Sequence, residues 1–302
     1  MLKRLLKSLK REEINPITMQ VPVTASAVTI SRDQHTISRK KISKNALNVM
    51  YELTRAGYQA YLVGGGVRDL LLGLSPKDFD VATDATPEQV KHHFKRARIV
   101  GRRFRIVHVR FGREIIEVTT FRGSHDQTDN SKINRKDKTQ VNDHGMLLRD
   151  NVFGSLHDDA MRRDFTINSI YSDQEGNLFD PYNGKKDLEN GIIKFIGDPE
   201  VRIIEDHLRI LRFFRFVAVL GLKHKNIDPK YLPIIEKHID RINGLSNERV
   251  AAEIRKILLS TFPSFALKLM DKVNLYEKVL GIYSEVSLLK LEKLESRYNL
   301  TP

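Results

Sequence analysis

The chain of 302 residues contains no cysteine. It therefore cannot form a disulfide scaffold or a zinc site with thiolate ligands. No apolar run reaches the roughly 18 residues that a membrane span requires, and the N-terminus lacks the apolar stretch and cleavage site of a secretory signal. These absences fit a protein of a reducing compartment, and we expect a cytoplasmic location.

Acidic residues are too few to balance the basic ones. The chain has 38 Asp and Glu against 51 Lys and Arg, a net charge of +13. Such an excess favours a polyanionic partner, because neutralising phosphates provides non-specific affinity for nucleic acid. Charge alone does not separate a nucleic-acid-binding protein from a merely basic one. The 40% of hydrophobic residues suffices for a core, in one large domain or in two to three small ones.

The first 42 residues are predicted to form a basic mobile leader. In residues 1–12 the leucines recur at helical spacing, and lysines and arginines occupy the other face. A short basic amphipathic helix of this kind can contact an anionic membrane surface or RNA. A frayed basic tail is the alternative.

Residues 43–198 carry the pattern of an α/β unit, which we take as a head with a small mixed sheet flanked by helices. Residues 123–145 contain only two large aliphatic side chains and are expected to be a mobile loop. The other expected elements are a helix over 44–56, a strand over 58–63, a helix over 67–72, a strand over 77–82, a helix from Thr86, strands over 104–111 and 114–121, and a strand over 192–196.

From Glu200 onward the apolar residues recur with the helical period of 3.6. We expect an all-helical neck over residues 199–260. A short helical body follows over 261–302, truncated relative to longer proteins of similar pattern. The expected helices include one capped by Ser246 and two more, over 265–280 and 286–298. The fold class is therefore α+β.

Two carboxylates mark the expected strand 77–82. Asp78 and Asp80 stand at i and i+2, so both side chains project from one face of a strand. Adjacent carboxylates repel unless a cation lies between them, and such oxygen ligands suit Mg²⁺, with Mn²⁺ as an alternative. A third carboxylate, Glu117, would permit a two-metal arrangement. An Asp-x-Asp pair alone is a weak signal, since surface pairs are common.

Three consecutive glycines, Gly64 to Gly66, lie between an expected strand and an expected helix. A turn of this kind exposes backbone N–H groups that can hold a phosphate. The surrounding residues match neither the Walker motif nor the dinucleotide-binding motif. Strand, glycine turn, helix and Asp-x-Asp strand in this order form a much more specific signal than either part alone.

Residues 62–80, LVGGGVRDLLLGLSPKDFD, closely resemble the signature of the DNA polymerase beta-like nucleotidyltransferase superfamily. The match is to its class II branch, the bacterial poly(A) polymerases and CCA-adding tRNA nucleotidyltransferases. The resemblance continues through residues 117–122, 162–168 and 205–209, and spans about residues 30–260. It implies metal-dependent, template-independent addition of nucleotides from ATP, or also CTP, to RNA 3′ ends.

This resemblance also implies roles for individual residues. Asp78 and Asp80 would be metal ligands, with Glu117 as the third catalytic carboxylate. Arginine pairs well with phosphate, and aspartate accepts hydrogen bonds from ribose hydroxyls. Without the resemblance, Arg162 to Asp164 would be taken as a surface cluster of ion pairs. The residues expected to bind the nucleotide are Gly64, Gly65, Arg68, Asp69, Arg122, Arg162, Arg163, Asp164, Asn168, Asp206 and Arg209.

Asp206 and Arg209 stand at i and i+3, which predicts one helix face. Together they offer an acceptor beside a donor fork, which matches the base edges of adenine and cytosine and not those of uracil or guanine. A mispaired edge leaves buried polar groups unsatisfied, at about 1–3 kcal/mol each. The ordinary alternative is an i,i+3 salt bridge. The family pattern usually has proline where His207 stands.

Two regions point to different branches of the family. Residues 99–109, IVGRRFRIVHV, resemble the element that distinguishes poly(A) polymerases, whereas residues 205–216 and 245–259 are more similar to CCA-adding enzymes. A fusion of both types or a divergent lineage would explain this change. We expect a poly(A) polymerase. A CCA-adding enzyme is the alternative, and a catalytically silent RNA-binding module is a more distant one.

Overall fold

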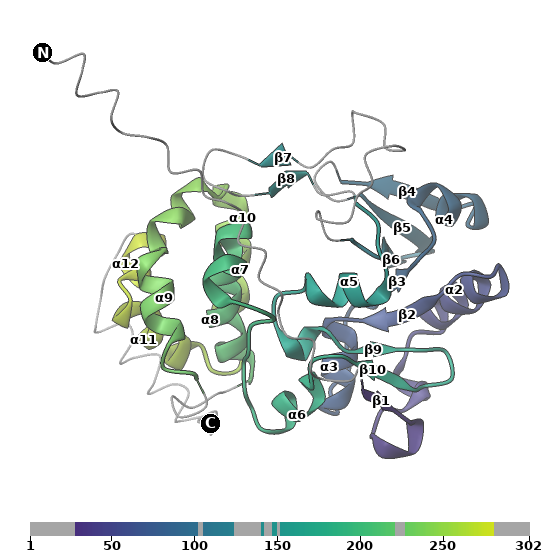
Figure 1. The fold of residues 1–302 in the computed structure, drawn as a ribbon, viewed down its shortest axis with the longest axis horizontal. Coiled ribbons are helices and arrows are strands. Elements are labelled where there is room, and N and C mark those ends of the chain that lie inside the picture. The colour runs from purple at the N-terminus through teal and green to yellow at the C-terminus, as the bar shows by residue number, and fades with distance from the viewer. Residues whose placement is uncertain are drawn as a thin grey trace, which may run out of the picture.

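The computed structural model describes residues 28–101, 105–123, 140–141, 147–149, 152–220 and 227–280. Figure 1 shows a sheet with helices packed around it on one side of the molecule and a bundle of helices, α7 to α12, on the other. The leader helix over 1–12, most of the loop 123–145 and the helix over 286–298 lie outside the described residues and stay predictions. Within the described ranges no helix is long and apolar enough to cross a membrane.

The head contains an eight-stranded sheet in the order β1-β10-β9-β2-β3-β6-β5-β4. β3 and β6 run parallel, and all other neighbouring strands of this sheet are antiparallel, so the mixed sheet expected from the sequence is confirmed. β7 and β8 form a separate pair. The strands are β1 Val28–Ile30, β2 Ala60–Val63, β3 Asp80–Thr83, β4 Ala97–Val100, β5 Ile106–Phe111, β6 Glu114–Thr120, β7 Gln140–Val141, β8 Leu147–Arg149, β9 Tyr171–Ser172 and β10 Leu178–Asp180.

Several helices begin at a residue whose side chain caps the first turn, and the sequence marks two of these caps, Thr86 and Ser246. The Ser43 hydroxyl accepts backbone hydrogen bonds at the start of α2, and Thr86 and Ser246 cap α4 and α10 in the same way. The α-helices are α2 Lys44–Arg55, α3 Gly65–Leu71, α4 Pro87–His93, α5 Leu156–Met161, α6 Gly184–Glu189, α7 Pro199–Glu205, α8 Leu208–Leu220, α9 Tyr231–Lys237, α10 Asn247–Leu258, α11 Pro263–Lys272 and α12 Leu275–Leu280.

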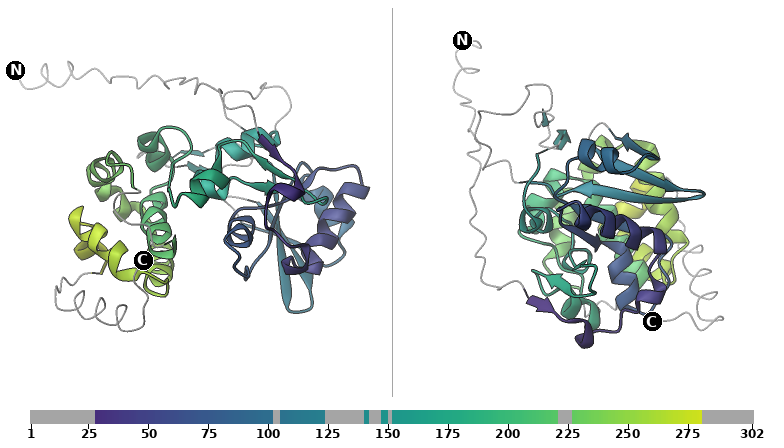
Figure 2. Two further views of the ribbon diagram at one scale, coloured as in Figure 1. Left: turned by 90° about the horizontal axis from the view of Figure 1, so that it is seen from below. Right: turned by 90° about the vertical axis from the view of Figure 1, so that its right-hand side faces the viewer.

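Hydrophobic residues of the described ranges gather in three clusters, two in the head and one that the head shares with the helical part. α2 and α4 pack on one face of the sheet, where Val49, Val90 and Val107 are buried in one cluster. On the opposite face α5 packs against β2, β3 and β9 through Ala160 and Tyr171. The third cluster surrounds the phenylalanines of α8 and also contains Phe165 and Phe195 of the head. The left view of Figure 2 shows the head and the helical part side by side.

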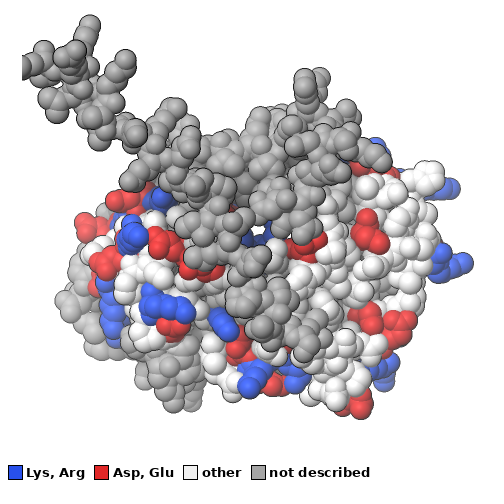
Figure 3. Space-filling view, in the orientation of Figure 1, with Lys and Arg blue, Asp and Glu red and all other residues white. Residues whose placement is uncertain are grey.

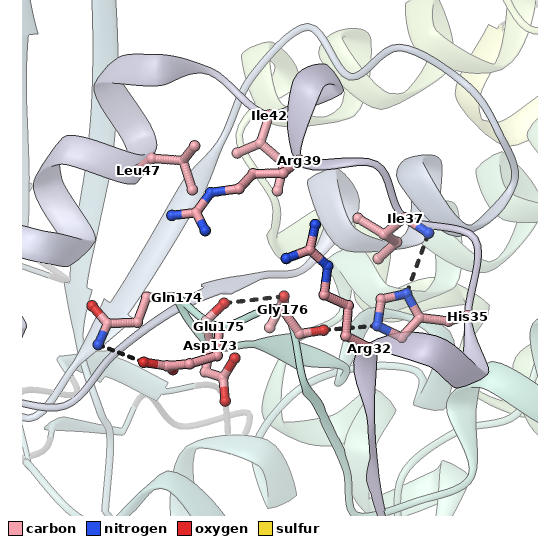
Figure 4. Close-up of a pocket in the computed structure, with 11 residues that line it drawn as sticks. Arg32, His35, Ile37, Arg39, Ile42, Leu47, Asp173, Gln174, Glu175 and Gly176 are labelled. Atoms are coloured by element: carbon pink, nitrogen blue, oxygen red, sulfur yellow. Dashed lines mark hydrogen bonds between the residues drawn. The ribbon is translucent and has the colours of Figure 1, made fainter.

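Part of the predicted leader belongs to the head. β1 pairs with β10, and two 3-10 turns, Arg32–Gln34 and Arg39–Lys41, follow it. The His35 ring joins this segment to the β9–β10 turn: Nε2 lies 2.7 Å from the Gly176 carbonyl oxygen, and Nδ1 accepts from the Ile37 N–H (Figure 4). The leader therefore overlaps the sheet from Val28 onward. A three-residue strand is too short to show a periodic pattern in the sequence.

Two other predicted elements differ from the structure. The strand expected over 192–196 is wrong, because only a single bridge pairs Phe165 with Phe195 there. The apolar residues of this segment, including Ile193, are buried in the helical core, and a short apolar run cannot by itself separate a strand from a buried loop. Asp78 precedes β3, which begins at Asp80.

Candidate active site

Three carboxylates meet at the start of β3. Asp80 is its first residue, and Glu117 on the parallel neighbour β6 is its direct partner in the register. Facing residues of adjacent strands lie about 5 Å apart and project from the same face. Asp78 and Glu117 are exposed, whereas the intervening Phe79 side chain is 7% exposed in the core. The register and the alternation place Asp80 and Glu117 on the face away from α2 and α4, and Asp78 lies near Asp80 in the segment before β3.

The carboxylate of Asp80 is poorly stabilised in the protein alone. Burial, and then the charges of Glu117 and Asp78, raise its pKa to about 6 against the lowering effect of the nearby Arg163. A cation among these oxygens would offset the repulsion, and the hard oxygen donors fit Mg²⁺ or Mn²⁺. Within the described ranges, no three His, Asp or Glu side chains are already arranged as ligands of one ion.

Gly64 is the residue of the glycine turn that lies beside the Asp80 carboxylate. Its φ of 74° is in the region that favours glycine. A Cβ built there would lie 3.5 Å from Arg163 Nη1 and 3.8 Å from Asp80 Oδ2. The Gly64 backbone thus lies beside both a guanidinium and a carboxylate. A phosphate that contacts this turn would be within reach of Arg163.

Arg163 is held in place by Asp159 and Tyr171. Its Nη2 donates to Asp159 Oδ2 at 3.0 Å, its Nε donates to the Tyr171 hydroxyl at 2.8 Å, and that hydroxyl donates to Asp159 at 2.7 Å. Burial raises the pKa of Asp159, but the charge of Arg163 and the Tyr171 hydrogen bond outweigh it, so the pKa lies below its usual value. Neither Asp159 nor Tyr171 is among the predicted site residues, although the i,i+4 spacing of Asp159 and Arg163 is a signal that the sequence contains.

A second buried network links α3 to the 162–168 segment. Arg68 donates from Nη1 to Asn168 Oδ1 at 2.8 Å and from Nε to Asp69 Oδ1 at 2.9 Å. Asn168 in turn donates to Asp164 Oδ1 at 3.1 Å, and Arg212 Nη2 lies 2.7 Å from Asp164 Oδ2. The structure thus brings together four residues predicted to bind the nucleotide. Arg212, on α8, was not predicted.

The remaining predicted arginines of the head lie at the edge of these networks. Arg162 donates from Nη1 to the Gly123 carbonyl at 2.6 Å. The Arg122 N–H donates to Asp159 Oδ1 at 3.3 Å. Through Asp159, the backbone after β6 is therefore attached to the same carboxylate that holds Arg163.

Asp206 and Arg209 do not share one helix. Asp206 is the extended C-cap of α7, with φ −146° and ψ 102°, and α8 begins at Leu208. The Asp206 carboxylate lies 3.3 Å from Arg249 Nη2, while Arg209 donates to Glu205 at 2.8 Å and to the Arg162 carbonyl at 3.1 Å. The predicted helix face is wrong, because spacing alone does not show a break between two short helices. Arg209 nevertheless joins the neck to the head.

A glycine turn beside two carboxylates, with a third carboxylate on a parallel neighbouring strand of a mixed sheet, is typical of the nucleotidyltransferase fold. Residues 60–194 match the family model described as "Poly A polymerase head domain", and residues 226–285 match "Probable RNA and SrmB- binding site of polymerase A". The chain belongs to the family of bacterial poly(A) polymerases and CCA-adding enzymes.

Relatives of both branches are similar to the chain. It is 48% identical over 272 residues to poly(A) polymerase I of Escherichia coli O157:H7, which covers 90% of this chain and 57% of that protein. It is 36% identical over 244 residues to the CCA-adding enzyme of Bacillus subtilis, covering 81% of this chain and 57% of that protein. The chain thus spans less than two thirds of the length of these relatives.

Solved structures of CCA-adding enzymes share the fold. The enzyme of Bacillus stearothermophilus in complex with CTP superposes with a TM-score of 0.64 at 34% identity, covering 76% of this chain and 52% of that one. The Thermotoga maritima enzyme complexed with tRNA has a TM-score of 0.66 at 20% identity, covering 89% and 60%. The second likeness establishes the fold alone.

Proposed function

We propose that this chain carries the activity of a poly(A) polymerase, which transfers AMP from ATP to RNA 3′ ends without a template. The main observation behind the proposal is the register that sets Glu117 opposite Asp80, with Asp78 close enough for its charge to raise the pKa of Asp80. The greater identity to poly(A) polymerase I than to a CCA-adding enzyme supports this choice.

In the proposed reaction the RNA 3′-hydroxyl attacks the α-phosphorus of ATP, and the bond to pyrophosphate breaks. Asp78 and Asp80 would hold Mg²⁺ or Mn²⁺, which supplies Lewis-acid stabilisation of the phosphate charge. Arg163, beside Gly64 and Asp80, would pair with the triphosphate. The hydrogen bond from Arg68 to Asn168 holds α3, which follows the glycine turn, against the 162–168 segment.

Base selection is assigned to Asp206 and Arg209, which lie at the α7–α8 junction. Asp206→Ala removes the acceptor for the adenine N6 amino group. We expect selectivity for ATP over UTP and GTP to fall about tenfold to a hundredfold, from a lost discrimination of about 1–3 kcal/mol. Total incorporation should fall less. Single-turnover assays with each nucleotide measure this.

Lys237→Ala, which removes a surface pair with Glu200, is the control for Asp206→Ala. If Asp206→Ala keeps the wild-type preference for ATP, Asp206 serves only to pair with Arg249.

The choice between the two family branches is tested by what the protein adds and to which RNA. With Mg²⁺ and ATP we expect open-ended addition of A to an unrelated RNA. The comparison is tRNA lacking its CCA end, supplied with CTP and ATP singly and together. Addition of two C and one A, confined to that tRNA, would establish a CCA-adding enzyme. A protein that binds RNA but incorporates nothing with Mg²⁺ or Mn²⁺ would be a silent RNA-binding module.

The head, the neck and the body would each have a different role in this reaction. The head, residues 43–198 together with β1, holds the reacting groups, and the neck, residues 199–260, selects the base. The helices from residue 261 belong to the body, which would hold RNA of the mRNA or tRNA class. ATP and RNA 3′ ends meet in the cytoplasm, and we place the activity there.

A further inference from the structure

A row of side chains crosses the sheet from the carboxylates to its edge. The register sets Asp80 opposite Glu117, Glu117 opposite His108 on β5, and His108 opposite Arg98 on β4. Directly opposite residues share one face of a sheet. At a spacing of about 4.8 Å between strands, Arg98 on the edge strand lies ~14 Å from Asp80. The row changes from acidic to basic over this distance.

Two more arginines, Arg96 and Arg110, lie beside Arg98 on the same face. The Arg110 N–H donates to the Arg96 carbonyl at 3.3 Å, so these two residues are neighbours across β5 and β4. Arg96, Arg98 and Arg110 are exposed, and no carboxylate of the described residues forms an ion pair with any of them. We call these three arginines the β4–β5 basic surface. Blue side chains also project at the right-hand edge of Figure 3, where α2 and α4 lie.

The β4–β5 basic surface destabilises the folded protein when no anion is bound to it. Like charges opposite one another on neighbouring strands are destabilising. Charge on an edge strand prevents sheets from joining, which would account for Arg98 but not for Arg110 on the inner strand β5. Val107 and Val109 of β5 are buried on the face that packs against α4. Because side chains alternate along a strand, Arg110 lies on the opposite face. A polyanion on this face would relieve the repulsion.

We propose that the β4–β5 basic surface binds the phosphates of the RNA strand upstream of its 3′ end and directs that end to Asp80 and Glu117. This inference rests on the proposed function, because it supplies the RNA path for that same site. At about 3.4 Å of rise per stacked nucleotide, ~14 Å corresponds to roughly four nucleotides. Phosphates nearer the 3′ end lie over the carboxylates, and those beyond reach the arginines.

The test is the double variant Arg98→Gln/Arg110→Gln. For a 20-nucleotide oligo(A) primer, KM should rise about fivefold to twentyfold, while kcat and the KM for ATP stay within about twofold. The slope of log affinity against log salt should become shallower by about 1.4, since each single-strand phosphate contact contributes about 0.7. A trinucleotide primer is too short to reach Arg98, so its incorporation should not change.

The matched control is Lys91→Gln/Lys95→Gln, which removes the same charge from exposed positions on and just after α4, on the other side of the sheet. An equal loss in this control, or an unchanged KM for the long primer in the arginine variant, overturns the proposal. RNA affinity is also measured by fluorescence anisotropy without ATP. If the wild-type protein incorporates no nucleotide, the proposed function is wrong. The proposed RNA binding by the β4–β5 basic surface is still supported if the arginine variant binds RNA more weakly and the lysine control does not.

Discussion

The Asp80→Asn variant is expected to lose at least about a thousandfold of AMP incorporation, equivalent to about 4 kcal/mol of transition-state stabilisation. Asparagine keeps the shape of the side chain and removes the charge that a cation requires. RNA affinity should stay within about twofold, because Asp80 is not part of the basic surface. Glu117→Gln and Asp78→Asn are expected to act in the same direction. Near-normal turnover in Asp80→Asn would contradict the metal assignment.

The same variant should melt at a higher temperature than the wild type in a buffer with EDTA. The pKa of Asp80 is raised to about 6 by burial and by the charges of Glu117 and Asp78. A carboxyl group with a raised pKa destabilises the folded protein as the pH rises through that value. The difference in melting temperature between Asp80→Asn and the wild type should therefore increase from pH 5 to pH 7. It should amount to about 2–4 °C for each kcal/mol of repulsion removed. Mg²⁺ should narrow the gap by stabilising only the wild type.

Asp159→Ala is expected to give the largest loss of stability, about 3–5 kcal/mol at pH 7. The Asp159 side chain is 6% exposed and accepts from both Arg163 and Tyr171. Its removal leaves the half-buried Arg163 guanidinium without its ion-pair partner. Urea denaturation followed by circular dichroism measures the change. Glu189→Ala, which removes another i,i+4 pair at the surface, is the control and should cost at most about 1 kcal/mol.

The double variant Asp159→Ala/Arg163→Met should be more stable than the sum of its parts, because it leaves no buried charge unpaired. The pKa of Asp159 lies below its usual value. The stability it contributes is therefore present above the ordinary aspartate range and is lost as the pH falls through the folded-state pKa. The difference between wild type and Asp159→Ala should shrink accordingly at acid pH. A constant difference from pH 7 to pH 3 would show that lost packing, not charge, causes the effect.

Local patterns predicted most of the elements near the site. α4 and α10 begin where Thr86 and Ser246 predict them, since a cap and a first turn involve only neighbours in the chain. The glycine turn follows equally from its sequence, because the φ of Gly64 suits glycine. Elements that depend on distant partners were less predictable. β1 needs β10 to be a strand, and the apolar run at Ile193 is buried without forming one.

The sequence by itself determined the family, and it predicted the three carboxylates and the glycine turn, because each is contained in a short contiguous motif. Only the tertiary structure decided which residues meet. The register that sets Glu117 opposite Asp80 depends on strand pairing over long separations. The same holds for the contact of Asp164 with Arg212 and for the break that separates Asp206 from α8. Burial and pairing across distant segments set these positions and the charge state of Asp80, and neither is encoded in local spacing.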